Sequence, residues 1–338
     1  MSGAETILEV KNLSTYFLNE GGSVLRAADG LSYSVRRGEC VAIIGESGSG
    51  KSVGALSVMR LIPYPPGLTV NGEILFRGQN ILDMTDDELA DFRGSKIAMI
   101  FQEASTALNP VMPIGKQIAE ALRVHNPALS KKEAAEKAVE LLRKVKIPNP
   151  EERAKQYPFE FSGGMQQRAM IAMAMSCEPE ILFADEPTTA LDVTVQAQVL
   201  EELNALRREN NMAMVIITHN LGIVARYAES VKIMYGGKIV EEGTPNDIFL
   251  NPHHPYTLGL IRAVPRLDLP RSYGLHAIDG EPPDMSKVPP QSCAFAPRCK
   301  YATEECWNNR PQPEEIEPGH FCSCFHSSET AQERSELV

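Results

Sequence analysis

Apolar and polar residues alternate along the start of the chain, between residues 5 and 44. Turn-forming residues interrupt the alternation at 19–22 (Asn-Glu-Gly-Gly) and at Arg37-Gly38. A period of two with such breaks is typical of antiparallel β-strands. The sequence therefore predicts antiparallel strands, which lead into a continuous apolar strand at residues 41–44.

Three later apolar runs are continuous, and polar residues follow each of them. The runs cover residues 96–101, 181–184 and 214–218, and the residues that follow are Gln102, Asp185 with Glu186, and His219. Continuous apolar runs of this length predict buried strands. Ligand groups collect at the carboxyl ends of strands in an open α/β sheet, so we expect Asp185 and Glu186 to face a ligand.

Helical spacing dominates the segment from Glu103 to Gln156, which we interpret as an insert after the strand predicted at residues 96–101. The triplet Ser162-Gly163-Gly164 then precedes another helical stretch, residues 169–176. Beyond Gly243 the composition shifts to proline and other loop-forming residues. This shift predicts a less regular C-terminal appendage.

The stretch GESGSGKS, from Gly45 to Ser52, stands between the strand at 41–44 and a helix-compatible segment. Backbone N–H groups can point inward there because glycine tolerates a curled backbone, and the positive end of the helix dipole faces the same space. The pattern predicts a triphosphate site in which Lys51 reaches the β- and γ-phosphates and Ser52 binds Mg²⁺. The alternative is a glycine-rich turn without a ligand. The nucleotide would contact Gly45, Ser47, Gly48, Ser49, Gly50, Lys51, Ser52 and Val53.

Composition narrows the class of protein. With 338 residues, the chain is longer than one typical domain. A formal net charge of -11 and the lack of a basic run give no support for nucleic-acid binding. The sequence has no apolar stretch of about 18 residues and no signal-peptide pattern, so we expect a cytosolic protein. Its seven cysteines are then expected to be thiols or metal ligands.

Taken in chain order, these features resemble the ATP-binding cassette (ABC) ATPases over about residues 5–245. The features are the glycine-rich loop, the glutamine after a strand, Ser-Gly-Gly before a helix, the Asp-Glu pair, Leu191-Asp192, and a strand followed by histidine. The resemblance implies an α/β P-loop NTPase fold: a RecA-like core, an antiparallel β subdomain and a helical subdomain at about 103–165.

The resemblance also implies roles for individual residues. Ser52 and Gln102 would lie close to Mg²⁺, and Asp185 would act on the metal through water. Glu186 would polarise the attacking water, and His219 would bridge that water and the γ-phosphate. This is phosphoryl transfer by positioning and charge neutralisation.

An aromatic residue, the Ser-Gly-Gly triplet and an aspartate would also contact the nucleotide. Phe17 precedes a turn and is preferred over Tyr16 for stacking on the base, although burial in the sheet core is the competing interpretation. The triplet at 162–164 would complete the site of a second cassette packed head to tail, and Phe161 replaces the leucine of the general pattern. Asp192 is included in the nucleotide-binding set.

Finer features resemble the ATP-binding subunits of bacterial dipeptide and oligopeptide importers, close to the D-type subunit. They lie at Ala107–Met112, Phe161–Arg168, Thr188–Gln198 and His254–Thr257. Importers of nickel, glutathione and antimicrobial peptides use nearly the same cassette, so the substrate stays open. The resemblance implies a second ATPase subunit in a heterodimer, two membrane permeases and an extracytoplasmic binding protein. It implies a peripheral position on the cytoplasmic face of the inner membrane.

Two other classes of function stay open. One is a cassette ATPase that acts on nucleic acid or ribosomes, although such proteins usually carry two cassettes or a long coiled-coil insertion. The other is a redox or sensing protein that uses the same fold. The C-terminal cysteines are the only support for this class.

Five cysteines lie close together near the end of the chain: Cys293, Cys299, Cys306, Cys322 and Cys324. In a loop-rich cytosolic segment, a four-thiolate metal site is their natural use. The spacings match neither the paired Cys-x2-Cys knuckles of zinc sites nor the ferredoxin run, so spacing leaves the metal undecided.

The segment 246–338 resembles the C-terminal extension of the peptide-importer cassettes. Cys-Ala-Phe-Ala-Pro-Arg-Cys, from Cys293 to Cys299, matches the family's cysteine pattern, which holds a [4Fe–4S] cluster together with two later cysteines. In this family the last ligand follows a histidine by four positions, which selects Cys324 after His320. Cys306 would be the third ligand, and Cys322 is a spare or substitute ligand. Zinc and free thiols are the alternatives, and the role expected of the site is structural.

Overall fold

The computed structural model describes residues 5–19, 21–188, 191–265 and 277–334. The chain folds as two compact units. The first unit is built mainly from Asp83–Ile216. The second unit combines Ile7–Ser34 and Cys40–Leu82 with the chain from Ile217 onward.

The second unit contains a four-stranded sheet in the order β2-β1-β4-β5. Its strands are β1 (Thr6–Leu18), β2 (Val24–Arg36), β4 (Gly67–Phe76) and β5 (Gln79–Asn80). β1 and β4 run antiparallel, with Leu8 opposite Phe76. The strands predicted for the start of the chain are therefore confirmed as β1 and β2, which are neighbours in this sheet. The two apolar segments on either side of Asn12 form one strand, because a register shift there, with Asn12 at φ 50°, absorbs the break in alternation.

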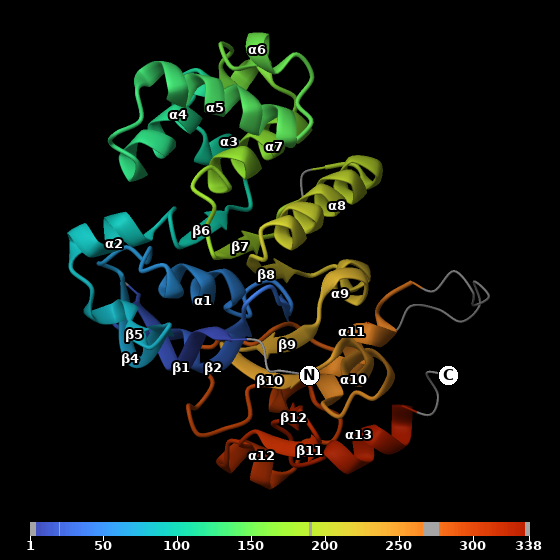
Figure 1. Cartoon of the computed structure of the whole chain (residues 1–338). Coiled ribbons are helices and arrows are strands. Elements are labelled where there is room, and N and C mark those ends of the chain that lie inside the picture. The colour runs from blue at the N-terminus through green and yellow to red at the C-terminus, as the bar shows by residue number, and fades with distance from the viewer. Residues whose placement is uncertain (1–4, 20, 189–190, 266–276, 335–338) are drawn as a thin grey trace. The chain divides into compact units, whose positions relative to one another are not determined.

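A second set of strands in this unit follows the order β11-β12-β10-β9-β3. The strands are β3 (Cys40–Ile44), β9 (Ser230–Tyr235), β10 (Lys238–Gly243), β11 (Glu314–Glu317) and β12 (His320–Cys322). β3 and β9 are parallel, whereas β10 is antiparallel to β9 and to β12. The C-terminal cysteine segment thus continues the sheet that carries the glycine-rich loop (Figure 1).

Short helices complete the second unit (Figure 1). They are α1 (Lys51–Val58), α9 (Leu221–Tyr227), α10 (Pro245–Leu250), α11 (Pro255–Arg262), α12 (Glu304–Asn308) and α13 (Ser327–Glu333). Capping explains where several of them begin. Thr244, for example, forms a capping box with Asp247, and Pro245 follows as the first helical residue.

The first unit pairs β6 (Ile97–Ile100) and β7 (Ile181–Asp185) in parallel, with β8 (Ala213–Thr218) on the other side of β7. The three predicted buried strands are confirmed, because every residue of β6, β7 and β8 is buried. The predicted helical segment forms α3 (Ala104–Ala107), α4 (Ile114–His125), α5 (Lys131–Lys144) and α6 (Pro150–Arg153). The other helices are α2 (Asp86–Phe92), α7 (Gly163–Ala174) and α8 (Val193–Glu209).

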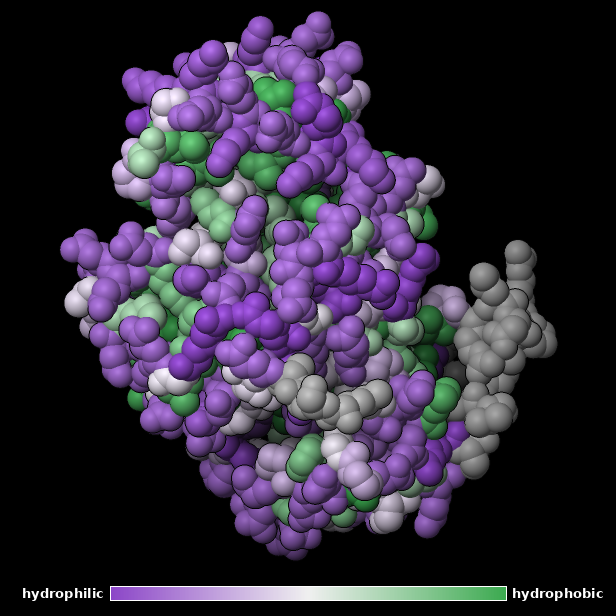
Figure 2. All heavy atoms as spheres, viewed as in Figure 1, coloured by the Kyte–Doolittle hydropathy of each residue, from purple (hydrophilic) through white to green (hydrophobic). Residues whose placement is uncertain are grey.

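The exterior of the molecule is predominantly polar in the view of Figure 2, with hydrophobic residues in small areas among charged ones. In the described ranges, none of the helices combines the length and the apolar character that crossing a membrane requires.

Candidate functional site

The glycine-rich loop connects β3, which is wholly buried, to α1. Gly48 has φ 80°, and Gly50, the N-cap residue of α1, has φ 97°. A Cβ atom on Gly50 would lie 2.0 Å from the carbonyl oxygen of Ala27, and one on Gly45 would lie 2.3 Å from that of Met234. Glycine is therefore required at Gly50 for its backbone conformation and for lack of space, and at Gly45 for lack of space.

Lys51 lies inside this loop, with 6% of its surface exposed. Its Nζ donates hydrogen bonds to the carbonyl oxygens of Gly45 (2.7 Å) and Glu46 (2.8 Å). The ammonium group thus lies beside the loop backbone at the start of α1. A buried cation at a helix N-terminus is suited to a phosphate group.

Two aromatic residues near the end of β1 differ in their contacts. The hydroxyl of Tyr16 donates to Asp29 Oδ1 at 2.8 Å, and burial together with this carboxylate raises the tyrosine pKa. Phe17 is half-buried beside Gly67, where an added Cβ would lie 2.8 Å from the ring. The ring of Phe17 keeps an exposed part that can stack on a base.

In the first unit, Gln102 and Glu186 come together after two neighbouring strands. The amide Nε2 of Gln102 donates to Glu186 Oε2 at 3.2 Å. Glu186 has φ 45°, a left-handed conformation that bends the chain directly after Asp185, the last residue of β7. Non-glycine residues in this conformation cluster at functional sites. The structure therefore joins two of the three predicted catalytic side chains.

The Ser-Gly-Gly triplet forms the N-terminus of α7. Ser162 is the N-cap residue, and its Oγ accepts the N–H of Met165 at 3.4 Å. Ser162 and Gly163 are exposed, and a Cβ on Gly163 would meet nothing within 4 Å. Gly164 is more enclosed, because an added Cβ would lie 3.1 Å from Val195. The first part of the triplet is thus open to an approaching molecule.

Asp192 caps α8. Its Oδ1 accepts the backbone N–H groups of Thr194 (3.1 Å) and Val195 (3.0 Å). This cap explains the aspartate by helix stability alone. Two residues of the predicted 188–198 segment, Thr189 and Ala190, lie outside the described residues.

His219 is exposed directly after β8, at the boundary to α9, which Asn220 caps. It belongs to the second unit, like the glycine-rich loop. Gln102, Asp185, Glu186, the Ser-Gly-Gly triplet and Asp192 belong to the first unit.

Four cysteines line one small cavity in the C-terminal segment: Cys293, Cys299, Cys306 and Cys324. Cys322 lies on β12 and is not among the residues that line this cavity. Burial raises the pKa of Cys293 to about 11 and that of Cys324 to about 12. Across residues 5–19, 21–188, 191–265 and 277–334, no group of three or more His, Cys, Asp or Glu side chains is arranged to hold a metal ion.

A buried carboxylate beside this segment was missed by the sequence analysis. Glu241 accepts the backbone N–H groups of His253 (2.6 Å) and His254 (3.0 Å) and contacts Nε2 of His320 at 2.9 Å. Glu241 and His320 are almost fully buried. The histidine that marks the cysteine spacing therefore anchors β12 to β10.

The sequence analysis also did not predict the contacts of Glu46, which lies in the glycine-rich loop. Arg298 and Tyr256, both from the C-terminal part of the chain, contact it. More than 200 residues separate each of them from Glu46, and no periodicity or motif could indicate the contacts.

The chain matches two protein-family models. The model described as "ABC transporter" matches residues 28–189, and the model "Oligopeptide/dipeptide transporter, C-terminal region" matches residues 240–306.

Named relatives cover nearly the whole chain. A probable peptide ABC transporter ATP-binding protein, y4tR of Sinorhizobium fredii, is 47% identical over 96% of this chain and 96% of its own length. The oligopeptide transport ATP-binding protein OppD of Bacillus subtilis is 47% identical over 93% of this chain and 87% of its own. The dipeptide transport ATP-binding protein DppD of the same species is 46% identical over 97% of each chain.

Solved structures share the fold. One is a dimeric, post-hydrolysis state of the ATP-binding cassette MJ0796 bound to ADP and Pi. It is 28% identical, covers 71% of this chain and 99% of its own, and has a TM-score of 0.64. Another is cbiO1 from Clostridium perfringens, part of an ABC transporter complex, at 25% identity, 73% and 92% coverage and a TM-score of 0.61.

Proposed function

The chain belongs to the ATP-binding subunits of ABC transporters, in the family of the oligopeptide and dipeptide transport proteins, and from this premise we propose that it hydrolyses ATP to power peptide import. The observation that carries the proposal is the glycine-rich loop around a buried lysine, in a chain whose C-terminal part matches the peptide-transporter model. A loop of this kind binds phosphate groups through backbone N–H groups and one cation.

In the proposed reaction, the loop from Gly45 to Ser49, with Gly50, Lys51 and Val53, holds the phosphates, and Phe17 stacks on the base. Mg²⁺ would be held by Ser52 and Gln102, and by Asp185 through water. Hydroxyl, amide and carboxylate oxygens are the donors that Mg²⁺ prefers, so the donor set fits this ion. When bound, the ion neutralises negative charge on the phosphates.

Glu186 would polarise the attacking water, and His219 would hydrogen-bond it on the side of the γ-phosphate. The hydrogen bond between Gln102 and Glu186 supports this assignment, because it fixes the carboxylate beside a proposed Mg²⁺ ligand. General-base positioning of this kind accelerates a reaction by about 10²- to 10⁴-fold.

We propose further that two cassettes act together. The open N-terminus of α7, formed by Ser162, Gly163 and Gly164, would complete the ATP site of a partner subunit, with Asp192 close to the same interface. The exposure of Ser162 and Gly163 supports this, as does the dimeric form of the similar cassette MJ0796. The partner would be a second, different ATPase subunit.

Ser162→Arg tests the pairing of cassettes. Because Ser162 is exposed and Gly163 has open space beside it, the arginine fits in the separate chain but blocks close approach of a partner. We expect ATP binding by the separate chain to stay unchanged, while hydrolysis by the assembled transporter falls by about tenfold or more. Titration with a fluorescent ATP analogue and a phosphate-release assay measure the two quantities.

A matched control is Ser130→Arg, which replaces another exposed N-cap serine, at the start of α5. It should leave hydrolysis close to the parent's rate. Full activity of the Ser162 variant, or activity of a strict monomer at the parent's rate, would contradict the pairing.

The remaining partners follow from the same family. The ATPase would lie peripherally on the cytoplasmic face of the inner membrane, bound to two permeases that receive peptides from an extracytoplasmic binding protein. In this proposal residues 1–245 form the nucleotide-binding domain, and residues 246–338 form the transporter-type extension. The helical subdomain at about 103–165 transmits closure of the cassettes to the permeases.

We also propose that the C-terminal extension holds a [4Fe–4S] cluster on Cys293, Cys299, Cys306 and Cys324. Support comes from the cavity that these four side chains share and that Cys322 does not line. Zinc on the same four cysteines is the alternative. Such a cluster would cross-link a loop-rich segment and would stabilise its fold.

Cys324→Ser and Cys322→Ser form a matched pair, since Cys322 ends β12, Cys324 follows two residues later, and the two differ in whether they line the cavity. We expect the first variant to lose most of the iron and the absorbance near 400 nm of the anaerobically purified protein, and the second to keep both. Stoichiometric zinc without this absorbance in the parent would contradict the cluster.

A further inference from the structure

Glu46 is fixed in the glycine-rich loop through all of its polar groups. Its carbonyl oxygen accepts Lys51 Nζ at 2.8 Å and the N–H of Ser49 at 3.2 Å. Its own N–H donates to the hydroxyl of Tyr256 at 2.8 Å, and its carboxylate pairs with Arg298. A displacement of Glu46 would therefore displace the lysine and the first turn of the loop.

Arg298 holds the Glu46 carboxylate in a two-pronged pair. The distances are 2.7 Å from Nη1 to Oε2 and 3.3 Å from Nη2 to Oε1. Only 4% of the arginine side chain is exposed, whereas 27% of the glutamate side chain is. An arginine fork on a carboxylate fixes direction as well as distance, which a single contact does not.

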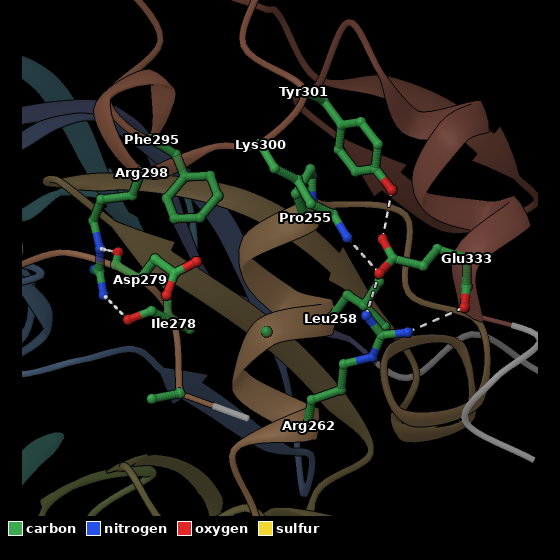
Figure 3. Close-up of a pocket in the computed structure, with 12 residues that line it drawn as sticks. Pro255, Leu258, Arg262, Ile278, Asp279, Phe295, Arg298, Lys300, Tyr301 and Glu333 are labelled. Atoms are coloured by element: carbon green, nitrogen blue, oxygen red, sulfur yellow. Dashed lines mark hydrogen bonds and ion pairs between the residues drawn. The ribbon is translucent and has the colours of Figure 1, made fainter. Parts of the chain in front are cut away.

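Backbone carbonyl groups hold the other side of the Arg298 guanidinium. Nε donates to the carbonyl oxygen of Asp279 at 3.0 Å, and Nη2 donates to that of Ile278 at 3.4 Å. Figure 3 shows Arg298 bonded to these two residues at one edge of a pocket of the C-terminal segment. The arginine therefore cannot rotate away from Glu46 without breaking bonds on both sides.

Tyr256 is fully buried and is the second residue of α11. Its ring packs against Tyr235 and Phe295, with centroids 4.6 and 5.5 Å away. This aromatic cluster holds the hydroxyl in place below the loop. Phe295 lies three residues before Arg298, so the two contacts with Glu46 come from one packed region.

We propose that Arg298 and Tyr256 are positioning residues for the phosphate-binding loop, and that they act on the nucleotide through Glu46. The C-terminal segment would thus be part of the apparatus that sets the affinity for ATP, in addition to its role as an extension. The inference rests on the proposed function in that the loop binds ATP phosphates. It adds a physical reason for joining a cysteine segment to an ATPase, since Arg298 directly precedes Cys299.

The experiment is an equilibrium titration of the purified full-length chain with trinitrophenyl-ATP and Mg²⁺. We expect Arg298→Ala to raise the Kd by about tenfold, as befits the loss of a charge-assisted bidentate contact. Tyr256→Phe, which keeps the packed ring and removes only the hydroxyl, should raise it by about threefold. Arg298→Lys keeps the charge without the fork and should lie between Arg298→Ala and the parent.

Two substitutions in the same pocket are matched controls. Arg262 and Tyr301 both bond to Glu333, across the pocket from Arg298 (Figure 3), and neither contacts the glycine-rich loop through these bonds. Arg262→Ala and Tyr301→Phe should leave the Kd within about twofold of the parent's value. Thermal unfolding without nucleotide shows whether Arg262→Ala destabilises the chain as much as Arg298→Ala does, and Tyr301→Phe as much as Tyr256→Phe does.

A double-mutant cycle separates positioning from general loss of structure. With Glu46→Ala in place, Arg298→Ala should change the Kd by less than about twofold, because the side chain through which it acts on the loop is already removed. In the assembled transporter, Arg298→Ala should raise KM for ATP and leave kcat at saturating ATP unchanged.

Three outcomes would overturn the inference. They are an unchanged Kd in both Arg298→Ala and Tyr256→Phe, effects equal to those of the pocket controls, or additive effects in the cycle. If Arg298→Ala does not fold, Arg298→Lys and Tyr256→Phe decide. A parent chain that binds no nucleotide would overturn the proposed function as well, and this result is distinct from the other three.

Discussion

Glu186→Gln is expected to slow ATP hydrolysis by at least about a hundredfold, because glutamine cannot polarise the attacking water as a carboxylate does. ATP binding should be retained. The side-chain amide keeps an oxygen that can accept the hydrogen bond from Gln102 Nε2, so the local geometry survives the change. Closed cassette dimers should then accumulate with ATP trapped between them. Phosphate release measures hydrolysis, and gel filtration in Mg-ATP measures dimers.

Glu103→Gln is the matched control. Glu103 is an exposed carboxylate directly after Gln102, at the start of α3, where its side chain makes no capping hydrogen bond. This variant should hydrolyse ATP close to the parent's rate. Hydrolysis by Glu186→Gln at that same rate would show that the assignment of the catalytic carboxylate is wrong.

The elements around the loop could be predicted because their signals are local. The strand at 41–44, the glycine turn and the start of α1 lie within a few residues, and each follows from apolar runs or glycine conformation. The buried strands before Gln102 and Asp185 could be predicted equally well, because a short continuous apolar run in a polar chain indicates a buried strand. The pair of Gln102 and Glu186 follows from the parallel neighbours β6 and β7.

Other parts of the fold carry no such signal. β11 is the sequence Glu-Glu-Ile-Glu, from Glu314 to Glu317, with three acidic residues and no apolar alternation. It pairs because it lies at the edge of a sheet, where both faces can meet water. For that reason the sequence predicted only an irregular appendage, whereas β11 and β12 extend an existing sheet.

The site shows the same division between local and distant signals. The proposed phosphate contacts of the loop follow from eight consecutive residues, but the contacts that hold Glu46 come from Tyr256 and Arg298. A salt bridge between distant residues depends on the packed fold and has no period or spacing. The sequence likewise indicated that the C-terminal cysteines belong together and that Cys322 is the spare one, and the fold places the other four around one cavity.

Lys51→Met is expected to weaken ATP binding by about tenfold to a hundredfold, because hydrogen bonds to charged groups contribute about 1.5–3 kcal/mol. Methionine keeps most of the apolar stem and removes the ammonium. In the parent, that ammonium is 2.7–2.8 Å from the carbonyl oxygens of Gly45 and Glu46, so it lies beside the backbone of the glycine-rich loop. Titration with trinitrophenyl-ATP and Mg²⁺ measures the loss.

Lys232→Met separates this effect from the cost of removing any buried lysine. Lys232 lies on β9 next to β3, has 10% of its side chain exposed and pairs with Glu242 at 3.0 Å. Both variants should unfold at lower temperature than the parent, since each leaves former hydrogen-bond partners without a donor. Only Lys51→Met should lose affinity for ATP. Equal affinity in the two variants would mean that the lysine holds the loop together without binding phosphate, and the phosphate site would then rest on backbone N–H groups and the helix dipole alone.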